Sequence, residues 1–142
     1  MAEKVRIGII GVGQQGERHV QGYQSIPEAE VVAIADLRED VAQRVAQQYG
    51  VPYVYTDYRQ LLARDDIDSV DIILHNRLHR PVTIDALEAG KHVYVEKPMS
   101  WTYRDAKEMY DTARRLGKML HVQVSTLSSA NPRAARRLIQ GG

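Results

Sequence analysis

Three glycines near the start of the chain, Gly11, Gly13 and Gly16, follow an apolar run with the spacing Gly-x-Gly-x-x-Gly. The first glycine of such a loop permits a tight turn from strand to helix. The second lets the backbone approach a phosphate, and the third lets the helix pack closely. A helix that starts there points its unpaired N–H groups and positive dipole end at an anion. The spacing predicts a pyrophosphate-binding loop made of Gly11, Val12, Gly13, Gln14, Gln15 and Gly16.

An acidic residue stands at the distance where the ribose of a dinucleotide would lie. Asp36 ends a second apolar run, residues 31–35, about twenty residues beyond the glycine loop. Its carboxylate can accept hydrogen bonds from the ribose hydroxyls of NAD, whereas Arg38 could pair with the 2′-phosphate of NADP. We therefore expect Asp36, Leu37 and Arg38 at the ribose, with NAD preferred and NADP as an alternative cofactor. A tight strand–helix turn without a ligand is the other interpretation.

A second group of residues able to do chemistry lies further along the chain. His75, Asn76 and His79 follow one apolar run, and Glu96-Lys97 followed by a proline closes another. In an open α/β sheet the ligand lies outside the carboxyl ends of the strands, so Glu96 and Lys97 are expected there. A lysine at that place can stabilise negative charge developing on a hydroxyl or carbonyl oxygen. The proline could fix the turn through a cis bond. A surface Glu–Lys pair beside a turn proline is the alternative.

Short β-rich runs and helical segments alternate along the whole chain and would position these residues. Strands are expected at about 4–10, 30–35, 52–55, 69–74, 91–95 and 118–124, with helices near 14–25, 38–48, 58–64, 79–89, 102–116 and 132–140. Asp57 and Thr102 are expected N-caps, and Gly50, Gly90 and Gly117 are expected to end helices. The alternation predicts an α/β fold, a doubly wound six-stranded parallel Rossmann sheet of order 3-2-1-4-5-6, as one domain spanning residues 1–142.

Composition excludes several other classes of protein. The chain has 142 residues, 44% of them hydrophobic, which suits one globular domain. It contains no cysteine, so disulfides, thiolate catalysis and zinc–cysteine sites are excluded, and no metal site is predicted. A net charge of +1 gives no indication of a nucleic-acid partner. Because no run is apolar enough for a membrane span and the N-terminus lacks a signal sequence, we expect a cytoplasmic protein.

Taken together, the glycine loop, the Asn-x-x-His group and the Glu-Lys-Pro turn resemble the Gfo/Idh/MocA oxidoreductase family, which includes glucose–fructose oxidoreductase and inositol dehydrogenase. The similarity covers the whole chain, and its most specific segment runs from Gly90 to Pro98. The resemblance implies a nicotinamide cofactor and hydride transfer at a hydroxyl or carbonyl carbon of a sugar, polyol or related compound. It also implies that Lys97 is catalytic, binds the substrate oxygen and contacts the cofactor, and that Glu96 lies near the nicotinamide ribose. Asn76 and His79 would belong to the loop lining the cofactor cleft.

The loop after the fourth strand departs from the family pattern. Where the family usually has Thr/Ser-Pro-Asn, this chain has Leu74-His75-Asn76, which places an imidazole near the cofactor. His75 is expected either to contact cofactor or substrate or simply to fill the loop.

A larger departure is the lack of the family's second α/β domain. The resemblance assigns to that domain most of the substrate pocket, the histidine that acts as general acid/base and the oligomer interface. His19, His92 and His121 fall where packing is the default role and are not expected to replace that histidine. We therefore expect the chain alone to bind cofactor, to turn over little and to be monomeric, with a homo-oligomer as the full-length form.

Two other functional classes remain. A non-catalytic dinucleotide-binding module could sense redox state or act through a partner, but Lys97 and its turn would then have no task. An S-adenosylmethionine enzyme shares the glycine loop and the acidic residue but not the Glu-Lys-Pro segment. The sequence favours the nicotinamide-binding part of a dehydrogenase.

Overall fold

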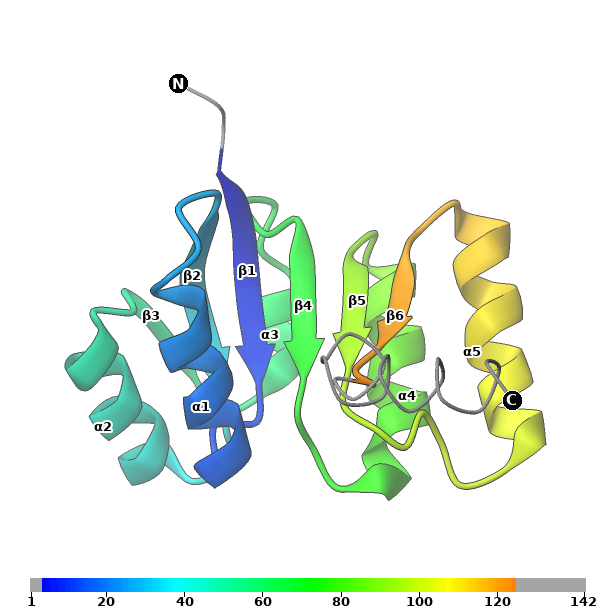
Figure 1. The fold of residues 1–142 in the computed structure, drawn as a ribbon, viewed down its shortest axis with the longest axis horizontal. Coiled ribbons are helices and arrows are strands. Elements are labelled where there is room, and N and C mark those ends of the chain that lie inside the picture. The colour runs from blue at the N-terminus through cyan, green and yellow to red at the C-terminus, as the bar shows by residue number, and fades with distance from the viewer. Residues whose placement is uncertain (1–3, 125–142) are drawn as a thin grey trace, which may run out of the picture.

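The computed structural model describes residues 4–124 of the chain (Figure 1). Within this range the strands are β1 (Val5–Ile10), β2 (Ala29–Ala35), β3 (Tyr53–Tyr55), β4 (Ser69–Ile72), β5 (His92–Val95) and β6 (Leu120–Val122). The helices between them are α1 (Gln14–Tyr23), α2 (Glu39–Tyr49), α3 (Tyr58–Leu62), α4 (Asn76–Glu88) and α5 (Tyr103–Leu116). The strands pair in parallel in the order β3-β2-β1-β4-β5-β6, which confirms the predicted Rossmann sheet.

Helices cover both faces of the sheet, as the apolar character of the central strands requires. The last four residues of β1 and the last five of β2 are buried, which is typical of strands packed on two sides. On one face Val20 of α1 and Val45 of α2 pack against the sheet. On the other face Leu61 of α3, Val82 of α4 and Met109 of α5 do so. Figure 1 shows α1 and α2 in front of the sheet and α3 and α4 behind it.

Several helix ends follow the sequence prediction. The side chain of Asp57 accepts a hydrogen bond from the N–H of Arg59 at 2.9 Å, and Thr102 accepts one from Asp105 at 3.1 Å. The predicted C-terminal glycines, Gly50, Gly90 and Gly117, all have positive φ. Local capping chemistry therefore sets these boundaries.

The start of α4 differs from the prediction. The helix begins at Asn76, three residues before the predicted start, so Asn76 and His79 are helical rather than part of a loop. A helix that started near residue 79 would have placed Pro81 in its first turn, where proline costs no hydrogen bond. Instead Pro81 lies inside the helix, and the His75 carbonyl closes the first turn by accepting from the N–H of Leu78. Strand β4 correspondingly ends at Ile72 rather than at residue 74.

The predicted helix at 132–140 lies outside the described residues. Between residues 4 and 124, no helix has both the length and the apolar character needed to cross a bilayer.

Candidate functional site

The carboxyl ends of four strands meet at one edge of the sheet, at the bottom of Figure 1. Ile10 at the end of β1 pairs with Ala35 at the end of β2 on one side and with Ile72 of β4 on the other. Ile72 in turn pairs with Val95 of β5. The segments that follow these strands, and with them all the predicted site residues, are therefore neighbours in space although they are up to eighty-odd positions apart in sequence.

The glycine loop after β1 contains two glycines that the fold itself demands. Gly11 has φ +91°, and a Cβ there would collide with the backbone oxygen of Ile73. A Cβ on Gly16 would collide with the carbonyl of Gly11, so the third glycine lets α1 pack closely on the loop. These are the conformational roles expected for the first and third glycines.

The middle glycine is different. Gly13 is the N-cap residue of α1 in an extended conformation, and as a glycine it has no side chain that could cap the helix. A Cβ on Gly13 would approach only the end of the flexible Arg38 side chain, at 3.3 Å. The protein therefore leaves room above Gly13, next to the exposed Gln14 and Gln15 at the helix N-terminus. An anion can approach the backbone there.

Asp36 is already hydrogen-bonded within the protein. Its Oδ2 accepts from the N–H of Val12 at 3.0 Å, and its Oδ1 accepts from the N–H of Arg38 at 3.0 Å. The Arg38 guanidinium lies at 3.2 Å from both oxygens. Burial raises the pKa of Asp36, but the bonds from Arg38 and Val12 outweigh it, so the net pKa is lowered. The carboxylate is charged at neutral pH, and a ribose would compete with Arg38 for it.

A largely apolar cavity of about 320 Å³ opens beside Asp36. It is lined by the ends of β1 and β2 together with residues of α3 and α4, including Ile10, Leu37, Tyr58, Leu74, Leu78 and Pro81. Tyr58 is held in place because its hydroxyl donates to Asp85 at 2.6 Å, and burial together with this carboxylate raises its pKa to about 12. A flat apolar ring such as adenine fits such a cavity. Sequence reasoning missed Tyr58, Leu78 and Pro81, because only the packing of α3 and α4 brings them to Asp36.

The residues around the start of α4 divide into two groups. His75 is exposed at the N-cap, and Asn76 is half-buried at the first helical position, both at the carboxyl edge. His79 is fully buried, with Nδ1 at 2.8 Å from the Pro98 carbonyl and Nε2 at 3.0 Å from the Leu74 carbonyl. The expectation that His79 lines the cleft is therefore wrong. Because α4 starts earlier than predicted, the ring turns inward and ties the end of β4 to the Glu-Lys-Pro turn.

The turn after β5 presents Lys97 to solvent. Glu96 is only 8% exposed, and its Oε2 accepts from the N–H of Lys97 at 2.9 Å. The Lys97–Pro98 bond is cis, the form considered from the sequence. Among the described residues, no hydrogen bond or ion pair engages the Lys97 ammonium. A charged donor is thus available at the carboxyl edge.

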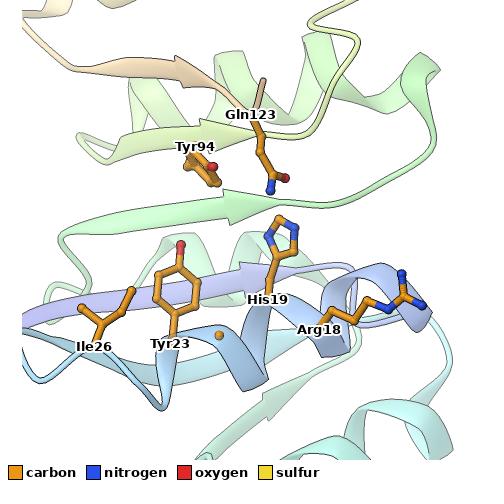
Figure 2. Close-up of a pocket in the computed structure, with 7 residues that line it drawn as sticks. Arg18, His19, Tyr23, Ile26, Tyr94 and Gln123 are labelled. Carbon is orange, nitrogen blue, oxygen red and sulfur yellow. The ribbon is translucent and has the colours of Figure 1, made fainter. Parts of the chain in front are cut away.

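Sequence reasoning missed the role of His19, which was assigned to packing. Its Nδ1 lies 2.8 Å from Asp71 Oδ2, and its Nε2 lies 3.3 Å from Glu96 Oε1. Tyr23, one helical turn on, donates its hydroxyl to the same Asp71 oxygen at 3.1 Å. Figure 2 shows His19 and Tyr23 directed from α1 toward Tyr94, at the side of an open hollow of about 520 Å³. The one available signal was Asp71, a carboxylate within an apolar strand.

Known proteins with similar sequences and structures agree with this geometry. The model of the Gfo/Idh/MocA family, described as an oxidoreductase family with an NAD-binding Rossmann fold, matches residues 5–124. An α-N-acetylgalactosaminidase of Shewanella oneidensis is 41% identical over 82% of this chain and 27% of its own length. D-glucoside 3-dehydrogenase of Escherichia coli is 42% identical over 82% of this chain and 33% of its own length.

Solved structures give the same result. The 3-ketoreductase KijD10 of Actinomadura kijaniata, in complex with NADP and TDP-benzene, superimposes with a TM-score of 0.92 at 33% identity, over 99% of this chain and 44% of that one. An NAD-binding oxidoreductase of Klebsiella pneumoniae gives 0.86 at 33% identity, over 97% of this chain and 39% of that one. The chain thus spans about a third of the length of its curated relatives. Because the family model matches residues 5–124, the chain belongs to the Gfo/Idh/MocA oxidoreductase family, in the part that carries the NAD-binding Rossmann fold.

Proposed function

We propose that this chain holds the nicotinamide dinucleotide of an oxidoreductase that transfers hydride at a hydroxyl or carbonyl carbon of a sugar, polyol or related compound. The observation that carries the proposal is the meeting of four strand ends at one edge. At this edge lie Gly13, which leaves room for a phosphate, and the Asp36 carboxylate, which could bind a ribose. The apolar cavity beside Asp36 and the exposed Lys97 lie at the same edge. Each of these features matches a different part of the same cofactor or of its substrate.

The residues present fit the cofactor. The space above Gly13 and the N-terminus of α1 suit a pyrophosphate, with Gln14 and Gln15 beside it. Asp36 suits the ribose, with Leu37 at the mouth of the apolar cavity. We assign Asn76, His75 and Glu96 to the nicotinamide half, since all three lie at the carboxyl ends of β4 and β5.

The bound nicotinamide supplies the hydride acceptor or donor, and the protein's part is orientation and charge. Lys97 donates a hydrogen bond to the substrate oxygen and stabilises the negative charge that develops on it. Glu96 fixes the beginning of the turn that carries Lys97, through its bond to the Lys97 N–H. We assign the proton transfer to a residue of a second domain in the full-length protein, which we expect to be a cytoplasmic homo-oligomer.

The choice between NAD and NADP depends on Arg38. Asp36 favours NAD, because a carboxylate repels a 2′-phosphate. Arg38, exposed and directed at Asp36, can turn toward that phosphate instead. The bound NADP of the similar 3-ketoreductase supports this second use. We propose that NAD is preferred and that NADP is accepted.

Sugars are the substrate class that the relatives support. One curated relative is a D-glucoside dehydrogenase and another is a glycosidase, so both act on glycosides. The 41% identity to the glycosidase makes glycoside hydrolysis a second candidate, since some glycosidases depend on NAD. A dehydrogenase accumulates NADH from NAD and a glycoside, whereas a glycosidase releases the free sugar without net change in the cofactor. Measuring both products from one reaction of the full-length protein separates the two.

The first experiment is a titration of this chain with NADH and, separately, NADPH, followed by calorimetry or by the fluorescence of its single tryptophan, Trp101. We expect saturable one-site binding that is tighter for NADH. Asp36→Asn, which keeps the shape of the side chain but removes its charge, should reduce this preference. Absence of binding by either nucleotide would contradict the proposed function, and tighter binding of NADPH would contradict the assignment of Asp36.

A further inference from the structure

A buried histidine of α1 lies between two carboxylates from different strands. His19 Nδ1 is 2.8 Å from Asp71 Oδ2, and Nε2 is 3.3 Å from Glu96 Oε1. The three side chains are 8%, 1% and 10% exposed. Asp71 belongs to the middle of β4, and Glu96 follows β5, so the imidazole links the helix to two neighbouring strands.

The other titratable groups near His19 come from three elements. Tyr23 of α1 donates its hydroxyl to Asp71 Oδ2 at 3.1 Å. Tyr94 of β5 lies with its ring 6.4 Å from the imidazole and stacks at 5.1 Å on His121 of β6. Arg18, next in the helix, is exposed at the rim of the same hollow. Asp71 Oδ1 is buried and has no hydrogen-bond partner among the described residues, so the Asp71 charge depends on His19 and Tyr23.

The geometry suits a doubly protonated ring. An imidazolium donates from both nitrogens, one to each carboxylate, whereas a neutral imidazole would direct a lone pair at one of them. Burial lowers the pKa of His19, but the hydrogen bond and charge of Asp71, followed by those of Glu96, outweigh burial and raise it. Burial raises the pKa of Asp71 as well.

Glu96 in turn holds the turn that carries the exposed lysine. Its Oε2 accepts from the N–H of Lys97 at 2.9 Å, while its Oε1 faces His19 and, at 3.4 Å, the side-chain amide of Gln15. One carboxylate therefore connects the glycine-loop helix, the buried histidine and the Glu-Lys-Pro turn.

We propose that His19 is a positioning residue that acts through Glu96, so that its protonation is coupled to binding of the nicotinamide half of the cofactor. The proposal rests on the proposed function, because it takes Glu96 to lie beside that half. When the ring loses a proton, the Glu96 carboxylate loses a charged donor and is held only by the N–H of Lys97 and the side-chain amide of Gln15. The affinity for cofactor then falls as the pH rises.

The bridge that His19 forms between Asp71 and Glu96 is tested without cofactor. The chain has five histidines, and NMR of its imidazole groups, with His19→Gln to assign the resonance, follows the titration of His19. We expect a midpoint above the ordinary value of about 6.5 and a downward shift in Glu96→Gln. His121→Gln, which changes an exposed histidine behind Tyr94, should leave the titration nearly unchanged. A midpoint at or below the ordinary value, or no response to Glu96→Gln, would overturn the bridge.

The coupling is tested by NADH titrations between about pH 6.5 and 9, that is, from the ordinary pKa of histidine upward. The wild-type chain and His121→Gln should bind about tenfold more weakly at the upper limit, the size expected for losing one hydrogen bond. In His19→Gln the affinity should stay constant within about twofold over the same interval. If the affinity for NADH fell equally with pH in the wild-type chain and in His19→Gln, the coupling would be overturned while the proposed function stayed intact. Absence of binding in the wild-type chain would overturn the proposed function and the coupling together, whereas the NMR titration would still decide the bridge.

Discussion

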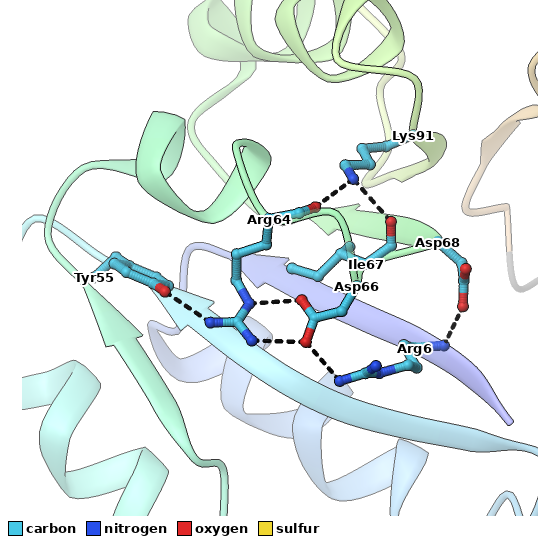
Figure 3. Close-up of polar contacts among 7 residues, drawn as sticks. All are labelled: Arg6, Tyr55, Arg64, Asp66, Ile67, Asp68 and Lys91. Carbon is cyan, nitrogen blue, oxygen red and sulfur yellow. Dashed lines mark hydrogen bonds and ion pairs between the residues drawn. The ribbon is translucent and has the colours of Figure 1, made fainter.

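Charged residues have opposite roles at the two ends of the strands, the amino edge and the carboxyl edge of the sheet. At the amino edge, shown in Figure 3, the Arg64 guanidinium donates twice to Asp66, at 2.8 and 2.7 Å, and once to the Tyr55 hydroxyl at 3.0 Å. Buried Lys91 donates to the carbonyls of Arg64 and Ile67 at 2.6 and 2.9 Å. Arg64, Asp66 and Lys91 are thus paired with groups of the protein, and these contacts stabilise the loop before β4.

The carboxyl edge instead keeps polar groups available. Lys97 is exposed and engages no described acceptor, and the space above Gly13 is closed only by the end of the Arg38 side chain. Asp71, just inside this edge, has one oxygen without a hydrogen-bond partner among residues 4–124. Unsatisfied groups cost stability, and they gather at sites where a ligand completes them. We therefore expect substitutions at the amino ends of the strands to affect stability and those at the carboxyl ends to affect function.

Lysines at the two edges make the sharpest test. Lys97→Ala should reduce turnover by the full-length protein roughly 100- to 1,000-fold, since it removes a donor to the developing oxyanion. The stability of the chain should stay the same because Lys97 is exposed, and its affinity for NADH should change much less than turnover, because the substrate oxygen is its main expected contact. Steady-state rates and chemical denaturation measure the two effects. A variant with full activity would remove Lys97 from the mechanism.

Lys91→Met should have the opposite effect. The buried carbonyls of Arg64 and Ile67 lose their donor, at a cost of about 3 kcal/mol in the free energy of unfolding. Affinity for NADH should not change, because Lys91 precedes β5 and lies at the far edge. Urea denaturation gives the free energy, with Lys107→Met as the control, since Lys107 forms an exposed pair with Asp111. Equal stability of Lys91→Met and wild type would contradict the structural role assigned to charged residues at the amino edge.

Glycines within the loop offer a second matched pair. Gly13→Ala should leave the fold intact but weaken NADH binding about tenfold, because its Cβ meets only a flexible arginine and then occupies the phosphate position. Gly16→Ala should instead destabilise the chain, since its Cβ meets the backbone of Gly11. Calorimetric titration and thermal unfolding of both variants distinguish them. If Gly13→Ala bound NADH as tightly as wild type, the pyrophosphate would lie elsewhere.

The smallest effect concerns Arg38. Arg38→Ala should weaken NADPH binding about fivefold, by removing a cation that can pair with the 2′-phosphate, and should change NADH binding less than about twofold. Parallel titrations with the two nucleotides check this. Equal losses for both would show that Arg38 does not read the phosphate.

Most of the fold could be predicted from local patterns, because strands buried on both faces are short apolar runs and helix ends carry their own caps. The prediction failed at the start of α4, which was expected near residue 79 and lies at Asn76. There, the contacts of His79 with the Leu74 and Pro98 carbonyls depend on tertiary packing, which the local pattern does not show. Two parts of the site were also missed: the contribution of α3 and α4 to the cavity beside Asp36, and the bridge made by His19.

The amino-acid sequence by itself determined the element order, the glycine loop, the acidic residue after β2 and the Glu-Lys-Pro turn, since each depends on residues close together in the chain. Only the tertiary structure decided which side chains face the site. His19, Asp71 and Glu96 come from three separate elements, and their contacts arise from the register of β4 with β5 and the packing of α1 on the sheet. Such contacts depend on long-range pairing, which local spacing does not encode.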